Sequence, residues 1–413
     1  MKKYIFIIIS CLSAGLYAQT ITNYTTSNGL ISNFVECITV DDNDNIWFGT
    51  SSGVQMFDGT YWTSYTTSIY PSMASDNIKV ISAMSNGDIW IGTDFGASRY
   101  DGLDWTTYTS ATMQSIPLIS NQVKSIDEDP STGIIWIGTN QGVTALDLSG
   151  VTNSLSIGSS DLHWSGVNAT SFDSNGDIWF SSPLGGITHY DGINYTTYDT
   201  SSGLLSQYAT DLIIDSEDNK WVGTSSGMSV LDASNSYFTQ HTRMYIMPPP
   251  DTLNPVVNIA LDSWGRIWTS IYVGYLSEGG IAYWNGSMWN DFHVSDGLAG
   301  PNVKGLAIDS QNNVWLATST GVSKISAIAS VVNETNISEL SIFPNPSNNT
   351  FYLSSESEII EKVKIYNKLG ALIYSANIMD YQYYIDISSF PEGLYYLDIK
   401  FSDTSIGKKI IIY

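Results

Sequence analysis

Three patterns in the sequence predict an all-β protein. A short apolar phrase such as IWFGT or KWVGT recurs seven times, at intervals of 42 to 47 residues. Each phrase lies among four strand-like runs separated by Gly- and Asp-rich turns, and a period of about 40–50 residues with four strands is typical of a β-propeller blade. Beyond residue 326 the rhythm stops and a different strand-rich segment begins. We therefore expect a seven-bladed β-propeller closed by the N-terminal strand, followed by a small C-terminal β-sandwich domain.

The N-terminus has the features of a secretory signal peptide, which we place at residues 1–18. Lys2 and Lys3 give it a positive end, an apolar run follows, and Ala18 ends a plausible cleavage site. An alternative is a lipoprotein processing box in which Cys11 is acylated, although the apolar run ahead of it is short. No other segment approaches about 18 consecutive apolar residues, so we expect no transmembrane segment.

Residues 20–326 are expected to form the propeller. In the fourth unit, alternation in VNATSFD, IWFSS, GGITHYD and INYTTYD predicts four strands. The seventh unit lacks a fourth strand, and residues 21–30 (ITNYTTSNGL) align with the outer-strand sequence YTTYDTSSGL of the fourth unit. We predict that this N-terminal segment completes the last blade and covers two exposed sheet edges. The repeated Trp residues are expected to fill the wedges between blades: Trp47, Trp90, Trp136, Trp179, Trp221, Trp268 and Trp315.

Charge and cysteine content exclude some classes of function. Asp and Glu number 40 against 16 Lys and Arg, and the net charge is −24. Such a surface repels phosphates, so we expect no nucleic acid partner. Once the signal peptide is removed, Cys37 is the single thiol, and we expect it to be a small buried hydrophobe. Asp/Asn turns such as residues 41–45 lack the ligand set of a calcium loop, and we predict no metal, cofactor or catalytic residue.

The repeated phrases resemble the two-component regulator propeller repeat, whose signature reads roughly DxxGxIWIGTxxGVxxYDGxxWxxYT. The best matches are residues 88–108 and 173–198, and the resemblance extends over about 300 residues. In that family the propeller is often the periplasmic sensor of a membrane histidine kinase. No membrane helix, kinase or DNA-binding region follows here, so the resemblance implies the propeller alone.

A polar linker is expected at residues 327–340 and a second all-β domain at residues 341–413. Pro344 and Pro346 exclude a helix and favour the start of an edge strand. The combination of FPNP, a KLG turn, PEGLYYL and a basic-then-apolar terminus resembles the C-terminal sorting domain of type IX secretion cargo. The resemblance implies export by the type IX secretion machinery to the cell surface or the extracellular space. The alternative is an ordinary β-sandwich that binds sugar or packs against the propeller.

Two long loops of the sixth blade form the candidate ligand site. Residues 239–255 precede its first strand and residues 271–280 join its second and third strands, so both should emerge on one face. Long loops on a rigid scaffold often carry function. Their aromatic rings, single cation and hydrogen-bonding tips suit a saccharide or a peptide: Arg243, Tyr245, Tyr272, Tyr275, Glu278 and His241. Alternatively these side chains only pack the loops together, and His163 with Trp164 offers a second candidate.

The sequence favours a secreted, non-enzymatic module that binds a ligand or a protein. One alternative is a propeller lyase, similar to virginiamycin B lyase or a polysaccharide lyase. Such an enzyme needs a His with a carboxylate, and usually a divalent metal, near the axis, and the predicted inner strands carry no His. The other alternative, an extracytoplasmic sensor subunit of a two-component system, depends on the family resemblance alone.

Overall fold

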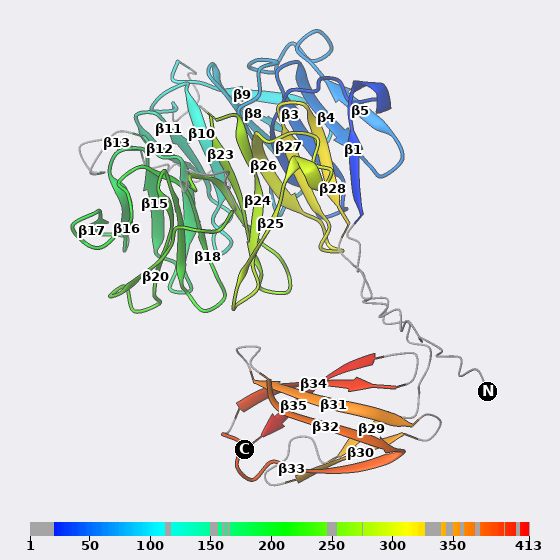
Figure 1. The fold of residues 1–413 in the computed structure, drawn as a ribbon. Helices are drawn as coiled ribbons and strands as arrows, with labels where there is room; N and C mark the ends of the chain where they lie inside the picture. Colours follow the sequence, from blue (N-terminus) through cyan, green and yellow to red (C-terminus); the bar gives the residue numbers. More distant parts are fainter. Residues whose placement is uncertain are drawn as a thin grey trace. The chain divides into compact units, whose positions relative to one another are not determined.

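The computed structural model describes most of the chain as two compact units (Figure 1). Strands up to Ile325 belong to the first unit, and strands from Leu340 onward belong to the second. The predicted signal peptide and all but the last residue of the predicted linker lie outside the described residues. The structure describes residues 20–111, 117–148, 156–158, 162, 166–245, 254–274, 276–326, 340–343, 350–355, 359–367, 372–391, 393–401 and 405–412.

Within these residues, the first unit contains seven four-stranded antiparallel sheets. In the first six, the strands lie side by side in the order of the sequence. The first three sheets consist of β2 (Val35–Val40), β3 (Ile46–Thr50), β4 (Gly53–Phe57) and β5 (Trp62–Tyr65); β6 (Val80–Ala83), β7 (Ile89–Thr93), β8 (Gly96–Tyr100) and β9 (Trp105–Tyr108); and β10 (Val123–Glu128), β11 (Ile135–Thr139), β12 (Gly142–Leu146) and β13 (Ser156–Gly158).

The remaining sheets follow the same plan until the last. The fourth to sixth consist of β14 (Ala169–Phe172), β15 (Ile178–Ser182), β16 (Gly186–Tyr190) and β17 (Tyr195–Tyr198); β18 (Ala209–Ile214), β19 (Lys220–Thr224), β20 (Gly227–Leu231) and β21 (Phe238–His241); and β22 (Val256–Leu261), β23 (Ile267–Val273), β24 (Glu278–Trp284) and β25 (Trp289–Phe292). The seventh consists of β26 (Val303–Ile308), β27 (Val314–Thr318), β28 (Gly321–Ile325) and, as its fourth strand, β1 (Ile21–Tyr24).

No helix in the described part of the chain is long and apolar enough to cross a membrane. The helical segments described there are two 3-10 turns, η1 (Thr26–Asn28) and η2 (Val294–Asp296). Each turn follows a strand and is followed by a glycine at positive φ, which is Gly29 at 106° after η1 and Gly297 at 113° after η2. A glycine adopts this conformation without the steric penalty that a side chain would bring.

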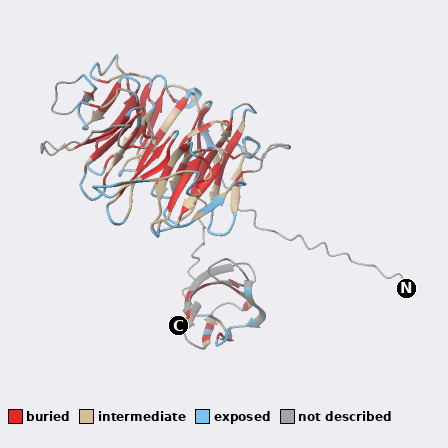
Figure 2. Ribbon diagram, turned by 90° about the vertical axis from the view of Figure 1, so that its left-hand side faces the viewer, coloured by how far each residue is buried: buried red, intermediate tan, exposed pale blue. Residues whose placement is uncertain are grey.

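The sheets pack on one another through their interiors. The second strand of every sheet is buried along its whole apolar phrase, and Figure 2 shows buried residues along the strands of this unit and exposed residues in its connections. First strands contact each other from β2 through β6, β10, β14, β18 and β22 to β26, and β26 contacts β2. Each repeated Trp is at most 8% exposed and lies in a hydrophobic cluster that combines its own sheet with the next one.

The indole nitrogen of the repeated Trp has an acceptor in five of the seven sheets. An Asp six residues earlier, in the turn before the second strand, accepts from Nε1 over 2.8–3.0 Å: Asp41, Asp173, Asp215, Asp262 and Asp309. Met84 and Pro130 occupy that position in the second and third sheets, and there the Nε1 atoms of Trp90 and Trp136 make no hydrogen bond to the described residues.

The same turns link consecutive sheets. Asp218 accepts from the backbone and hydroxyl of Ser174 in the preceding sheet, and Asn312 accepts likewise from Ser263. Asp44 of the first sheet accepts from Ser310 of the seventh, over 2.9 Å to the backbone nitrogen. Asp44, Asp218 and Asn312 have φ of 61° to 63°, a conformation that Asp and Asn tolerate better than most residues.

The second unit contains two sheets that share one hydrophobic core. One sheet is ordered β29 (Leu340–Phe343), β30 (Thr350–Ser355), β33 (Gln382–Asp386). The other is ordered β32 (Leu372–Asp380), β31 (Ile360–Asn367), β34 (Gly393–Lys400), β35 (Ser405–Ile412). Phe351 and Ile385 from the first sheet pack in one cluster with Val363, Leu397 and Ile399 from the second. Pro344 and Pro346 lie outside the described residues.

Candidate functional site

The described parts of the two long loops of the β22–β25 sheet lie against each other. The Tyr245 hydroxyl donates to the backbone oxygen of Gly279 over 2.7 Å. The backbone N–H groups of Met244 and Tyr245 donate to Oδ1 of buried Asn254, over 2.7 and 2.6 Å. The loop before β22 is therefore anchored to the start of β24, as expected for two loops that emerge on one face.

Two of the six predicted ligand residues are used in packing. Tyr245 is 4% exposed and its ring lies 4.4 Å from that of His293. The His241 ring is half-buried, stacks on Trp221 and accepts a hydrogen bond from Trp289 Nε1 at its Nδ1 over 3.2 Å. Burial lowers the pKa of His241, so its neutral form is favoured. Both side chains thus make their contacts within the protein.

Three further predicted residues lie among the described residues and are more open. Arg243 is exposed, and Tyr272 and Glu278 are partly exposed near the end of β23 and the start of β24. Burial raises the pKa of Tyr245, and the negative charges of Glu278, Asp291 and Asp296 raise it further. Tyr275, His163 and Trp164 lie outside the described residues.

A cavity of about 490 Å³ lies where the first strands of five sheets end, and it is open to solvent. Its walls come from β2, β6, β10, β14 and β18, which are the strands that contact one another from sheet to sheet. Hydroxyl, carboxylate and apolar groups alternate in the lining: Thr39, Ser82, Ala83, Met84, Ile126, Asp127, Glu128, Pro130, Thr170, Ser171, Phe172, Ile213 and Ile214. Sequence reasoning did not single out this cavity.

Two carboxylates on the first strands have raised pKa values. Burial and then the charge of Asp211 raise the pKa of Asp127 to about 7, although one side of Asp127 faces the cavity. Asp127 accepts from the backbone N–H of Thr170 in the next sheet over 3.2 Å. Burial raises the pKa of Asp211 to about 6, and Asp211 accepts from the backbone N–H of Ile259 over 2.6 Å. In the sequence, the one sign of these two carboxylates is an acidic residue within a mostly apolar strand.

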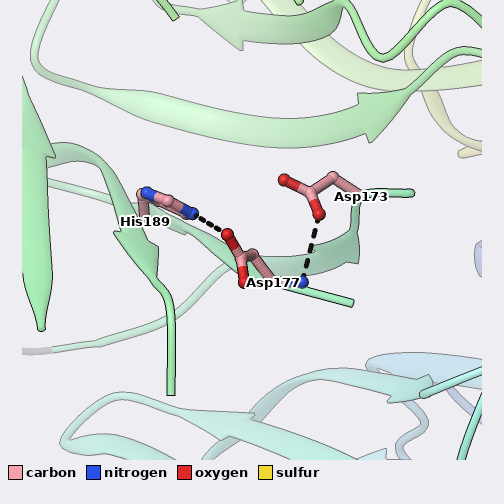
Figure 3. Close-up of side chains that lie close together, drawn as sticks. All are labelled: Asp173, Asp177 and His189. Carbon is pink, nitrogen blue, oxygen red and sulfur yellow. Dashed lines mark hydrogen bonds and ion pairs between the residues drawn. The ribbon is translucent and has the colours of Figure 1, made fainter. Parts of the chain in front are cut away.

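A third cluster joins Asp173, Asp177 and His189, and their ligand atoms all lie within 4.8 Å of one another (Figure 3). His189 Nε2 is 2.9 Å from Asp177 Oδ2, and the backbone N–H of Asp177 donates to Asp173 Oδ1. All three side chains are partly exposed. The sequence showed the turn but not the approach of His189, which comes from β16.

Two segments match known families. Residues 341–413 match the secretion system C-terminal sorting domain, and residues 29–52 match the two component regulator propeller. The second match contains β2, β3 and the repeated Trp47. No curated protein matches the chain in sequence.

Solved structures with a similar fold include an extracellular domain assigned to a hybrid two component system of B. thetaiotaomicron. Its TM-score is 0.63 at 18% identity, covering 95% of this chain and 57% of that chain. PorZ, an essential bacterial surface component of the type-IX secretion system of Porphyromonas gingivalis, has a TM-score of 0.58 at 15% identity, covering 93% and 60%. Virginiamycin B lyase from Staphylococcus aureus has a TM-score of 0.56 at 14% identity, covering 75% and 99%.

This chain thus spans less than two thirds of the length of the first two of these structures. At such low identities the likeness concerns the fold, and the four-stranded antiparallel sheets of the first unit agree with it. Together with the family matches, it shows that the chain carries a two component regulator propeller repeat and a secretion system C-terminal sorting domain.

Proposed function

We propose that this chain is a closed seven-bladed β-propeller that is exported by type IX secretion and acts outside the cell as a non-enzymatic binding module. Closure is supported by the pairing of the N-terminal strand β1 with β28 inside the last sheet. Two contacts between the last and first sheets add to it, namely the packing of Trp315 against Val35 and the Ser310–Asp44 hydrogen bonds. The matched sorting domain indicates secretion to the cell surface or extracellular space. Residues 1–18 would supply the signal peptide for the first membrane.

The cavity is the observation that carries the proposal of binding. It is formed by backbone that five packed sheets hold in place, so a ligand would meet a preorganised surface. Hydroxyl groups and the Asp127 and Glu128 carboxylates can accept hydrogen bonds from a saccharide or from the amine groups of a peptide. Exposed Arg243 with partly exposed Tyr272 and Glu278 would form a second contact face on the loops of the sixth sheet.

A lyase is the competing function, and Asp127 is the observation that favours it. A carboxyl group with a pKa of about 7 can exchange a proton near neutral pH. The described His–carboxylate pairs, His189 with Asp177 and His293 with Asp291, are absent from the cavity lining. A His–carboxylate pair that acted in a lyase reaction would therefore have to lie outside this cavity. Non-enzymatic binding in the cavity needs no His–carboxylate pair.

The test is a glycan and peptide array with the full mature chain and with two variants, Asp127→Asn and Arg243→Ala. Loss of a specific signal in Asp127→Asn locates the ligand in the cavity, and loss in Arg243→Ala locates it on the loops. An array without any specific signal contradicts the binding function. If the wild type converts a bound compound to products and Asp127→Asn does not, the protein is a lyase rather than a non-enzymatic binding module.

A further inference from the structure

The turn that carries Asp173 has an acidic residue where its counterparts have a hydrogen-bond donor. In four other sheets, the residue four positions after the first Asp donates a hydrogen bond to that Asp. Asn45, Asn219 and Asn313 do so through Nδ2, over 2.8 to 3.2 Å, and Arg266 through Nε. In the fourth sheet this residue is Asp177, whose ionised carboxylate can only accept. Two carboxylates therefore meet where the other sheets pair a carboxylate with a donor.

His189 is placed to complete this pair. It lies directly opposite Trp179 in the β15–β16 register, and its ring stacks on the indole at 4.5 Å with an angle of 20°. This stacking fixes the ring, and Nε2 then points to Asp177 Oδ2 (Figure 3). The Asp173 carboxylate is held in turn by Trp179 Nε1 and by the backbone N–H groups of Asn175 and Asp177. The three ligand groups are thus oriented by contacts of their own.

The second sheet shows what this position looks like as a simple ion pair. Arg99 lies opposite Trp90 and its Nε is 2.6 Å from Asp88 Oδ2, in the same register as His189 and Asp177. Met84 replaces the first Asp there, so one carboxylate faces one permanent cation. The fourth sheet instead has two carboxylates and a histidine. The negative charge of one carboxylate remains unbalanced there even when the histidine ring is protonated.

No other cation among the described residues fills this deficit by direct contact. Lys220 Nζ lies 4.8 Å from the centre of the Trp179 ring but donates to Asn235 Oδ1. A divalent cation would balance the local charge that the side chains leave.

We propose that Asp173, Asp177 and His189 bind a divalent transition-metal ion of the zinc class. Two carboxylate oxygens and one imidazole nitrogen are ligands that Zn²⁺ accepts, and water can fill the remaining position because the three side chains are partly exposed. The ion would take the place of the direct His189–Asp177 contact. It would join the β14–β15 turn to β16, which is a structural role independent of the proposed ligand cavity.

The experiment is Zn²⁺ titration of the full, tag-free mature chain by calorimetry, with Co²⁺ absorption as a second readout. The wild type should bind one ion at this site and melt at a higher temperature with Zn²⁺. Asp177→Asn restores the asparagine of three other sheets, and His189→Arg reproduces the pair of the second sheet, so both should fold. Each should weaken binding by at least about tenfold, since even the partners of metal ligands matter by 10–100-fold. Each should also abolish the thermal shift.

His293→Gln is the matched control, because His293 Nε2 also contacts an Asp, Asp291, over 3.2 Å but has no third ligand among the described residues. This variant should bind Zn²⁺ like the wild type. The proposal is overturned if the wild type binds no ion, if Asp177→Asn and His189→Arg bind as tightly as the wild type, or if His293→Gln removes binding. Melting curves without metal show whether each variant is folded. If only one of Asp177→Asn and His189→Arg folds, that variant alone is enough for the test.

Discussion

Tyr24 stacks on Trp315, with ring centroids 5.6 Å apart and an angle of 23° between the planes. The two residues come from opposite ends of the first unit, Tyr24 from β1 and Trp315 from β27. The ring of Tyr24 also approaches Phe57 and Trp62 of the first sheet, at 5.7 and 6.0 Å. One tyrosine thus contacts both the last sheet and the first.

Tyr24→Ala should lower the free energy of unfolding by about 2–4 kcal/mol, because it removes an aromatic side chain from the joint between two sheets. Tyr61→Ala is the control, since Tyr61 is 71% exposed and should change stability by less than about 0.5 kcal/mol. Urea unfolding of both variants provides the measurement. Deletion of residues 20–30 should lower the melting temperature further, and an unchanged melting curve would refute the closure by β1.

Asp309→Ala should cost about 2–3 kcal/mol of stability, because it leaves the buried Nε1 of Trp315 and Nδ2 of Asn313 without their acceptor. Asp309→Asn keeps one acceptor oxygen and should recover part of the loss. Asp58→Ala removes a carboxylate that binds only exposed backbone N–H groups, and it should have a smaller effect. Equal losses in Asp309→Ala and Asp58→Ala would contradict the role assigned to the Asp–Trp bond.

Asp127 should make the protein less stable as the pH rises from about 4 to about 7. Its pKa in the folded protein is about 7, above the value of about 3.9 expected in the unfolded chain, so the folded state binds the proton more tightly in this range. Stability contributed by the protonated form is complete below pH 4 and lost by the time the pH passes 7. Asp127→Asn should reduce this slope, because the raised pKa of Asp211, about 6, supplies the remainder, and the variant should be about 1–2 kcal/mol more stable than the wild type at pH 8.

Urea unfolding at pH 4.5, 6 and 8 measures the slope for the wild type and Asp127→Asn. Asp58 supplies the control of opposite sign, because hydrogen bonds from the Tyr61 and Thr60 backbone lower its pKa. Its contribution to stability is present above about pH 4 and lost below it, so Asp58→Asn should leave the slope between pH 4.5 and 8 as it is. An identical slope in wild type and Asp127→Asn would show that Asp127 does not titrate in this range.

Removal of residues 368–413 should stop export across the outer membrane, because it deletes β32 to β35 and with them most of the sheet that shares the core of the sorting domain. Cell fractionation should then find the protein in the periplasm, with its signal peptide removed. Arg243→Ala is a suitable control, since its exposed side chain lies in the first unit. Undiminished appearance of the truncated chain outside the cell would disprove the need for the sorting domain.

The sequence predicted the strands well because each one carries local signals. The phrase around each repeated Trp is mostly apolar and is buried at every position, as in a strand that is covered on both faces. The pairing partner of β1 was also accessible, because residues 21–30 repeat the pattern of an outer strand elsewhere in the chain. Cys37 was expected to be buried; it is partly buried against the cluster around Trp47, and burial raises the pKa of its thiol.

The sites were harder to predict, since they depend on residues that the repeat itself does not mark. Asp127 and Asp211 are 84 positions apart on two strands of different sheets, and only packing brings their charges together. In the loops of the sixth sheet, the sequence shows an aromatic residue but not its surroundings. Tyr245 is therefore a plausible ligand contact on sequence grounds, and its burial against His293 appears only in the structure.

The bond between Asn23 and Ser323 spans 300 residues of chain. The strand that pairs with β1 is β28, so β1 has no pairing partner until nearly the whole first unit has been made. Closing so long a stretch of chain is slow. On the proposed route, the seventh sheet would therefore be completed only after the chain as far as β28 has passed the inner membrane.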